Sequence, residues 1–225
     1  MCASTPLYIN WRTAVTGMSS ETSRIEAFSD GIFSIAATLL VLDLKPPAPG
    51  LPFWQGILNQ WPGYAGFLLS FLYIGMMWIN HHRLFSHIRR TSDTLLVVNL
   101  LLLLGVVWIP YPTSLLAQAI KAGQPRDAAI LYNASYLVIA LLYNLLLYTC
   151  ICRGLMDRQH AGVAELMRQY LPGPVICLLC LIIAWWSVPL SLVINGAMVL
   201  YFVMSPSSLS VCAEDAHEAR STVRS

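Results

Sequence analysis

Residues 24–44 read RIEAFSDGIFSIAATLLVLDL, an apolar stretch that also carries charge. About 21 helical residues extend roughly 32 Å, close to the thickness of the hydrocarbon core of a bilayer. Ser23 and Glu26 form a capping-box pattern at its start, and Lys45-Pro46-Pro47 stops it. The stretch is therefore predicted to be a membrane-spanning helix, and its four charged residues are Arg24, Glu26, Asp30 and Asp43.

The composition of the whole chain excludes a soluble or disordered protein. Apolar residues make up 57% of the 225 residues and charged residues only 11%, whereas soluble domains contain about 25% charged residues. The mean hydropathy of +0.64 agrees with this. The formal net charge of +2, without a basic stripe interleaved with aromatic residues, argues against nucleic acid as a partner. The sequence predicts a polytopic membrane protein whose surroundings are the lipid bilayer.

Runs without Asp, Glu, Lys or Arg locate the other spans, since charged side chains are costly against lipid. The last run, Gln169 to Ala213, is long enough for two helices that fold back near Ser187-Val188-Pro189. Pro110 and Pro112 predict a kink, and Pro172-Gly173-Pro174 predicts a late start or a bend. The predicted fold is all-α, with six transmembrane helices at about 24–45, 55–86, 93–120, 127–153, 168–187 and 189–205.

The positions of Lys and Arg orient this bundle. With the N-terminus inside, three of them (Lys45, Lys121 and Arg126) fall outside, and the inside set is larger, as the positive-inside rule requires. Both termini are therefore expected to be cytoplasmic. The polar segments 1–20 and 206–225 are expected to be mobile tails beside a single transmembrane domain, 21–205. The inside set is Arg12, Arg24, Arg83, Arg89, Arg90, Arg153, Arg158, Arg168, Arg220 and Arg224.

The first predicted helix has a polar side. Asp30, Ser34 and Thr38 share one stripe at the 3.6-residue period, next to an apolar stripe that includes Ile35. Charged groups near the bilayer centre cost roughly 2.5 to 3.5 kcal/mol each against lipid, so this helix is expected to face protein or water. In the alternative interpretation, the charges lie at the membrane interface, and Ser34 and Thr38 hydrogen-bond to their own helix.

These residues resemble a known family. Arg24-Ile25-Glu26-Ala27-Phe28-Ser29-Asp30 matches RxxxFSD, the signature of the transmembrane-protein-175 family of potassium channels. The following Gly-Ile-Phe-Ser-Ile-Ala-Ala-Thr is similar to the first helix of that family. Trp78-Ile79-Asn80-His81-His82-Arg83 is similar to the Trp and His cluster that ends its second helix. The sequence holds one copy of the signature, so it resembles the single-repeat prokaryotic members of the family.

The resemblance implies a pore and its lining residues. Members of the family conduct potassium without a TVGYG filter, which is also absent from this sequence. The first helices of a homotetramer line the pore, and the position of the main constriction corresponds to Ile35, with further apolar rings at Leu39 and Leu42. The threonine credited with a part in selectivity is present as Thr38. The implied location is a prokaryotic plasma membrane, with the N-terminus in the cytoplasm.

Physical reasoning agrees with this arrangement. One helix per subunit cannot enclose a water path, so such a pore requires several copies around an axis. A collar of Ile35 side chains gates by dewetting, because methyl groups do not replace the hydration shell of an ion. The hydroxyls of Ser34 and Thr38 flank the collar, and the carboxylates of Asp30 and Asp43 are expected to attract cations to the two mouths.

The signature motif is interpreted as support for the pore. Arg24 and Asp30 are six residues apart, which does not make an intrahelical pair, so each is expected to find partners on a neighbouring helix. The expected network joins the first helix to the second and consists of Arg24, Phe28, Ser29, Asp30, Trp78, His81 and His82.

Other patterns favour ordinary packing. His81, His82 and His87 lack the spacing and the carboxylate partner of a metal site, so no metal and no cofactor are expected, and potassium is only the permeant ion. The pair Cys177 and Cys180 lies in an apolar helix without a redox-motif setting. An enzyme is not expected, because no nucleophile, base and orienting group converge. The predicted function is a potassium-permeable cation channel, and the alternative is a secondary transporter of ions or small solutes, against which stands the lack of an internal repeat.

Overall fold

The computed structural model describes residues 11–47, 49–50, 52–156 and 170–204. Apart from one bridge between Ile88 and Met156, every regular element in these residues is helical, which confirms the all-α class. The expected C-terminal tail, 206–225, and residues 1–10 of the expected N-terminal tail lie outside the described residues. The elements are α1 (Trp11–Leu39), η1 (Leu40–Asp43), α2 (Phe53–Leu58), α3 (Trp61–Ser86), α4 (Asp93–Trp108), α5 (Pro110–Lys121), α6 (Arg126–Cys152), α8 (Pro172–Ala184) and α9 (Val188–Met204).

The first helix begins earlier than the sequence predicts. The capping box at Ser23 and Glu26 does not form, because α1 already runs from Trp11 through both residues. The twelve residues before Ser23 contain no proline, so the backbone hydrogen bonding continues without interruption. The Glu26 carboxylate instead contacts His82 of α3.

Proline positions divide two of the predicted helices. The predicted helix 55–86 is two helices, because Pro62 has no N–H to bond the carbonyl of Leu58, and α3 starts anew at Trp61. A kink is predicted near Pro110 and Pro112, and the helix is broken there, since α4 ends at Trp108 and α5 begins at Pro110. The predicted fold-back near Pro189 is also confirmed, since α8 ends at Ala184 and α9 begins at Val188.

Four segments are long and apolar enough to cross a membrane: Glu21–Asp43, Trp61–Ser86, Asp93–Lys121 and Arg126–Cys152. The third contains both α4 and α5. The helices α8 and α9 are apolar but shorter, at 13 and 17 residues, or about 20 and 26 Å. The structure therefore supports four full spans by length, and the six-span count remains a prediction.

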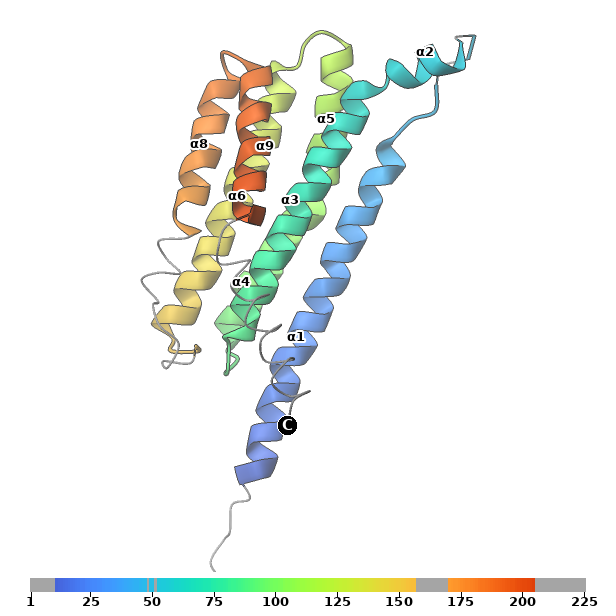
Figure 1. Ribbon diagram of the computed structural model, residues 1–225. Helices are drawn as coiled ribbons and strands as arrows, with labels where there is room; N and C mark the ends of the chain where they lie inside the picture. Colours follow the sequence, from blue (N-terminus) through green and yellow to red (C-terminus); the bar gives the residue numbers. More distant parts are fainter. Residues whose placement is uncertain (1–10, 48, 51, 157–169, 205–225) are drawn as a thin grey trace, which may run out of the picture.

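The helices lie side by side in one bundle (Figure 1). The helix α1 stands at one edge of the bundle and packs on α3 and α4. At the opposite edge, α8 packs on α6, and α9 packs on α8 and α3. One end of the bundle holds Arg24 and His82, and we call it the Arg24 end. The other holds Lys45, Gln60 and Lys121, and we call it the Lys45 end.

Polar side chains join the helices inside the bundle. The Ser70 hydroxyl of α3 lies 2.8 Å from the Thr113 hydroxyl of α5 and 3.2 Å from the Tyr132 hydroxyl of α6. The ring of Tyr136 stacks on Tyr73 with centroids 3.8 Å apart. Because lipid tails are as apolar as leucine, packing and such interhelical hydrogen bonds hold membrane helices together. This cluster joins α3, α5 and α6, and α1 packs on α3 of this group and on α4.

Candidate functional site

The two sides of α1 have opposite surroundings. Ser29 and Ala36 are fully buried where α1 packs on its neighbours. Seven residues complete about two helical turns, so Phe28 and Ile35 share the other side of α1, and Leu42 follows in η1. There Ile35 is 58% exposed and Leu42 is 75% exposed. A single chain therefore leaves an apolar stripe of α1 and η1 uncovered.

The three residues expected at the constriction all lie on the surface of the single chain. Leu39 is less exposed than Ile35 and Leu42, at 39%. Gly31, one turn before Ile35, has open space around the position of a Cβ atom. Gly31 and Ile35 thus both lie on the side of α1 that its own subunit leaves uncovered.

The hydroxyl of Thr38 is engaged by its own helix. It lies 3.0 Å from the carbonyl oxygen of Ser34 and 2.9 Å from that of Ile35, and it donates to them. This is the back-bonding that the alternative interpretation expected of Thr38. The lone pairs of the oxygen remain free, and Thr38 and Ser34 are both exposed. The pair can therefore offer oxygen atoms, but no hydroxyl proton from Thr38, to the exposed side.

Two polar contacts connect the exposed flank of α1 to α3. The indole Nε1 of Trp78 donates to Oδ1 of Asp30 at 2.9 Å. One turn further along α3, Nδ1 of His82 lies 2.8 Å from Oε1 of Glu26. The rings of Trp78 and His82 stack on each other with centroids 6.1 Å apart. Together these contacts fix the rotation of α1 about its own axis relative to α3.

A second, buried set of contacts joins three helices. The Asn99 amide of α4 donates to the Ser29 hydroxyl of α1 at 3.0 Å, and its carbonyl oxygen lies 2.9 Å from Nε2 of His81 on α3. The Ser29 hydroxyl in turn donates to the carbonyl of Ile25 at 2.8 Å. His81 and Ser29 are fully buried, and the His81 ring stacks on Phe85 at 4.2 Å between centroids. The amide of Asn99 therefore serves both neighbours at once.

Not every residue of the motif takes part in these contacts. The structure brings together Ser29, Asp30, Trp78, His81 and His82, directly or through Asn99 and Glu26. Arg24 and Phe28 lie outside this set and line an open groove of about 650 Å³ between α1 and α4. Among side chains that the structure describes, none forms a hydrogen bond or ion pair with Arg24.

Sequence reasoning missed two residues of the network. It assigned Glu26 to a helix cap and passed over Asn99 entirely. A signal for Asn99 was present, since one amide inside the run Leu95–Leu104 is costly in lipid unless it finds partners. That signal identifies a buried polar contact but not which helices it joins.

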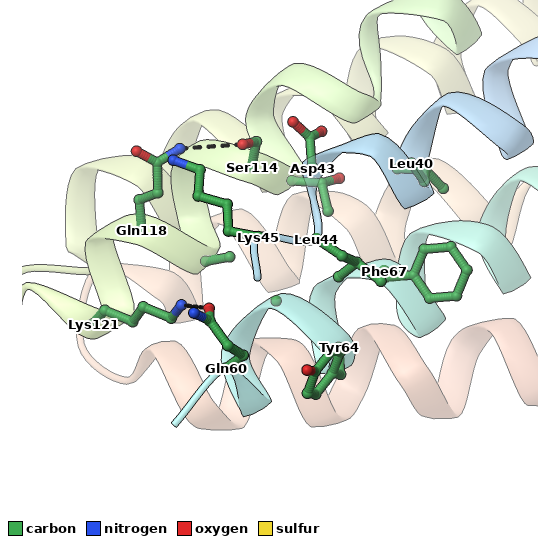
Figure 2. Close-up of a pocket in the computed structure, with 13 residues that line it drawn as sticks. Leu40, Asp43, Leu44, Lys45, Gln60, Tyr64, Phe67, Ser114, Gln118 and Lys121 are labelled. Carbon is green, nitrogen blue, oxygen red and sulfur yellow. Dashed lines mark hydrogen bonds between the residues drawn. The ribbon is translucent and has the colours of Figure 1, made fainter. Parts of the chain in front are cut away.

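A small cavity lies at the Lys45 end, between η1, α3 and α5 (Figure 2). Its volume is about 30 Å³, and Asp43 and Lys45 line it from the end of the first span. Figure 2 shows the ammonium of Lys121 bonded to the Gln60 amide oxygen, and both side chains line the cavity. The expected mouth residue Asp43 therefore shares this end of the bundle with two cations.

Comparisons with known proteins agree with the motif. The family model described as the endosomal/lysosomal potassium channel TMEM175 matches residues 24–110. A potassium channel of Streptomyces collinus is 38% identical over 81% of this chain and 92% of its own length. A potassium channel of Chamaesiphon minutus is 40% identical over 82% of this chain and 95% of its own length.

A solved structure gives the same result. The crystal structure of a lysosomal potassium-selective channel TMEM175 homolog from Chamaesiphon minutus superimposes with a TM-score of 0.75. It is 39% identical in sequence and covers 82% of this chain and 97% of that one. The chain therefore belongs to the TMEM175 family of ion channels.

Proposed function

We propose that the protein is a potassium-permeable cation channel whose pore is lined by α1 of each subunit in a homotetramer. The observation that carries the proposal is the division of α1 into a side buried on α3 and α4 and a side left exposed around Ile35. The potassium channels of Streptomyces and Chamaesiphon resemble it along most of the chain.

The exposed stripe argues for several copies around one axis. A single α1 cannot enclose water, and closed cyclic symmetry places the same face of every copy toward the axis. Gly31 leaves room for close approach between copies, because small residues allow helix backbones to pack tightly in membranes.

In this assembly Ile35 forms the main constriction, and Leu39 and Leu42 form further apolar rings. A ring of branched aliphatic side chains closes by dewetting and opens when the neck widens enough to hold water. The channel has no TVGYG filter, so the exposed oxygens of Ser34 and Thr38 are the polar groups nearest the neck. Selectivity is then modest, because these hydroxyls give a weaker field than a ring of carbonyl groups.

The contacts of the motif position this pore helix. Trp78 and His82 hold the flank of α1, and Asn99 holds its buried side through Ser29. Because a rotation of α1 about its axis would break these contacts, they keep Ile35 directed away from its own subunit.

The membrane topology belongs to the same proposal. In a prokaryotic plasma membrane the Arg24 end faces the cytoplasm, the Lys45 end faces outward, and α8 and α9 complete six spans with both termini inside.

Ion flux into liposomes tests the function. The purified chain is expected to pass potassium down its gradient without a coupled ion, and Ile35→Ala or Ile35→Asn is expected to raise the flux. Val97→Ala is a matched control, because Val97 on α4 is also 58% exposed but lies away from α1's stripe. Equal flux in all four proteins refutes the collar at Ile35, and flux that requires a second ion supports a transporter instead.

A further inference from the structure

Away from α1, an apolar groove of about 410 Å³ opens between α3, α5 and α9 near the Lys45 end. Small side chains, Ala65 and Ala117, contribute to its lining, and Leu69 and Leu192 are among the larger ones. Trp61 stands at the end of α3 and is 59% exposed. The groove takes no part in the contacts that position α1.

The lining offers no free hydrogen-bonding group deep inside. Its one polar side chain there, Tyr132, is fully buried, and its hydroxyl lies 2.6 Å from that of Tyr136 and 3.2 Å from that of Ser70. An occupant with N–H or C=O groups would leave them without partners, which is costly in an apolar environment. The chemistry of the groove therefore fits a hydrocarbon.

The depth of the groove fits one leaflet. From Trp61 to Leu69, α3 advances about 12 Å, and half of a hydrocarbon core is roughly 15 Å thick. Tryptophan is enriched where the hydrocarbon meets the headgroups, which places the rim at that level.

Two cations lie at the same end of the bundle as this rim, although neither lines the groove itself. Lys121 and Arg126 directly follow the lining residues Ile120 and Pro125. Lys121 bonds the neutral Gln60 side chain, and the Arg126 guanidinium lies 5.8 Å from the Trp185 ring centroid. Within the described part of the chain, neither cation forms an ion pair. Their charge is therefore not neutralised by a carboxylate of the described chain.

We propose that this groove binds an acyl chain of a phospholipid from the leaflet at the Lys45 end, with its phosphate held by Lys121 and Arg126. This proposal requires only that the chain lies in a lipid bilayer, as expected of its family, and it does not depend on a pore at α1.

The test uses the full chain in liposomes that contain phosphatidylglycerol with a photoreactive diazirine on one acyl chain. Mass spectrometry of labelled peptides is expected to find the label on residues 61–69 and 188–193. Ala65→Phe and Ala117→Phe fill the groove and are expected to lower this labelling by about tenfold, a change of about 1.4 kcal/mol in binding free energy. Leu68→Phe is the control, because Leu68 is 56% exposed on α3 and does not line the groove.

The phosphate contact is tested separately. Lys121→Gln with Arg126→Gln is expected to weaken labelling by the phospholipid but not by an uncharged methyl ester that carries the same diazirine chain. Unchanged labelling in the filled variants overturns the site, provided that their melting temperatures match the parent protein. Disulfide formation between copies that carry Leu192→Cys and Leu69→Cys also overturns it, because the groove is then an interface between subunits.

Discussion

The indole Nε1 of Trp78 and Oδ1 of Asp30 are 2.9 Å apart and join the flank of α1 to α3. Trp78 lies 48 residues after Asp30 in the chain, at the Arg24 end of the bundle. A hydrogen bond to a carboxylate is stronger than one between neutral groups, so this contact is a specific restraint on the rotation of α1.

Trp78→Phe removes this donor and keeps an aromatic ring. We expect the free energy of unfolding in detergent to fall by about 1 kcal/mol, since Trp78 is 42% exposed and water partly replaces the lost bond. Thermal unfolding and gel filtration measure the loss of stability and of assembled protein. Trp54→Phe serves as control, because Trp54 is 74% exposed on α2. Equal melting of both variants and the parent would show that the bond contributes nothing.

Asn99→Leu is expected to destabilise the fold more strongly, by about 2 to 3 kcal/mol. The substitution leaves the buried Ser29 hydroxyl and the buried His81 Nε2 without their shared partner. A double-mutant cycle with Ser29→Ala checks the origin of the effect. The two losses are expected to be less than additive, and strict additivity would argue that Asn99 and Ser29 do not interact.

Gly105→Ala tests the close approach of α4 and α6. A Cβ atom at this position would lie 2.9 Å from Cγ1 of Ile139, which is buried, so the variant is expected to lose about 1 to 3 kcal/mol of stability. At Gly75 the same change meets no atom within 4 Å, and Gly75→Ala is expected to be neutral or stabilising by up to about 1 kcal/mol. Thermal melting of the two variants side by side decides this, and a reversed order would contradict the packing.

Thr38→Val separates selectivity from stability. The Thr38 hydroxyl donates within its own helix, so its loss is expected to leave the melting temperature nearly unchanged. If its oxygen faces permeating ions, the ratio of potassium to sodium permeability falls, which reversal potentials in ion-substituted solutions measure. Thr149→Val is the control, because the Thr149 hydroxyl also donates within its own helix, to the carbonyl oxygen of Leu145 at 2.8 Å, but lies on α6. An unaltered ratio in Thr38→Val would remove this residue from the conduction path.

Local chemistry made much of the helical arrangement predictable. The interruption at Pro110 and the fold-back before Pro189 follow from proline chemistry. Proline has no N–H to bond the carbonyl four residues earlier, so it breaks the helix within its own turn. The start of α1 was less predictable, because Ser23 forms a cap only if the preceding residues leave the helix, and they do not.

The exposed stripe of α1 was also readable as a pattern. The period of 3.6 residues places Phe28 and Ile35 on one side of α1 whatever surrounds the helix. Neither the period nor hydropathy indicates that Asn99 would lie between Ser29 and His81, since these residues come from three helices.

Composition, periodicity and proline positions alone established a helical membrane protein with an unusual first span, because these properties act within a few residues of each other. The partners of Asp30, Glu26 and Ser29 were decided only when the bundle packed. Packing sets the depth and rotation of each helix, and a shift of about 1.5 Å or 100° per residue exchanges one polar partner for another.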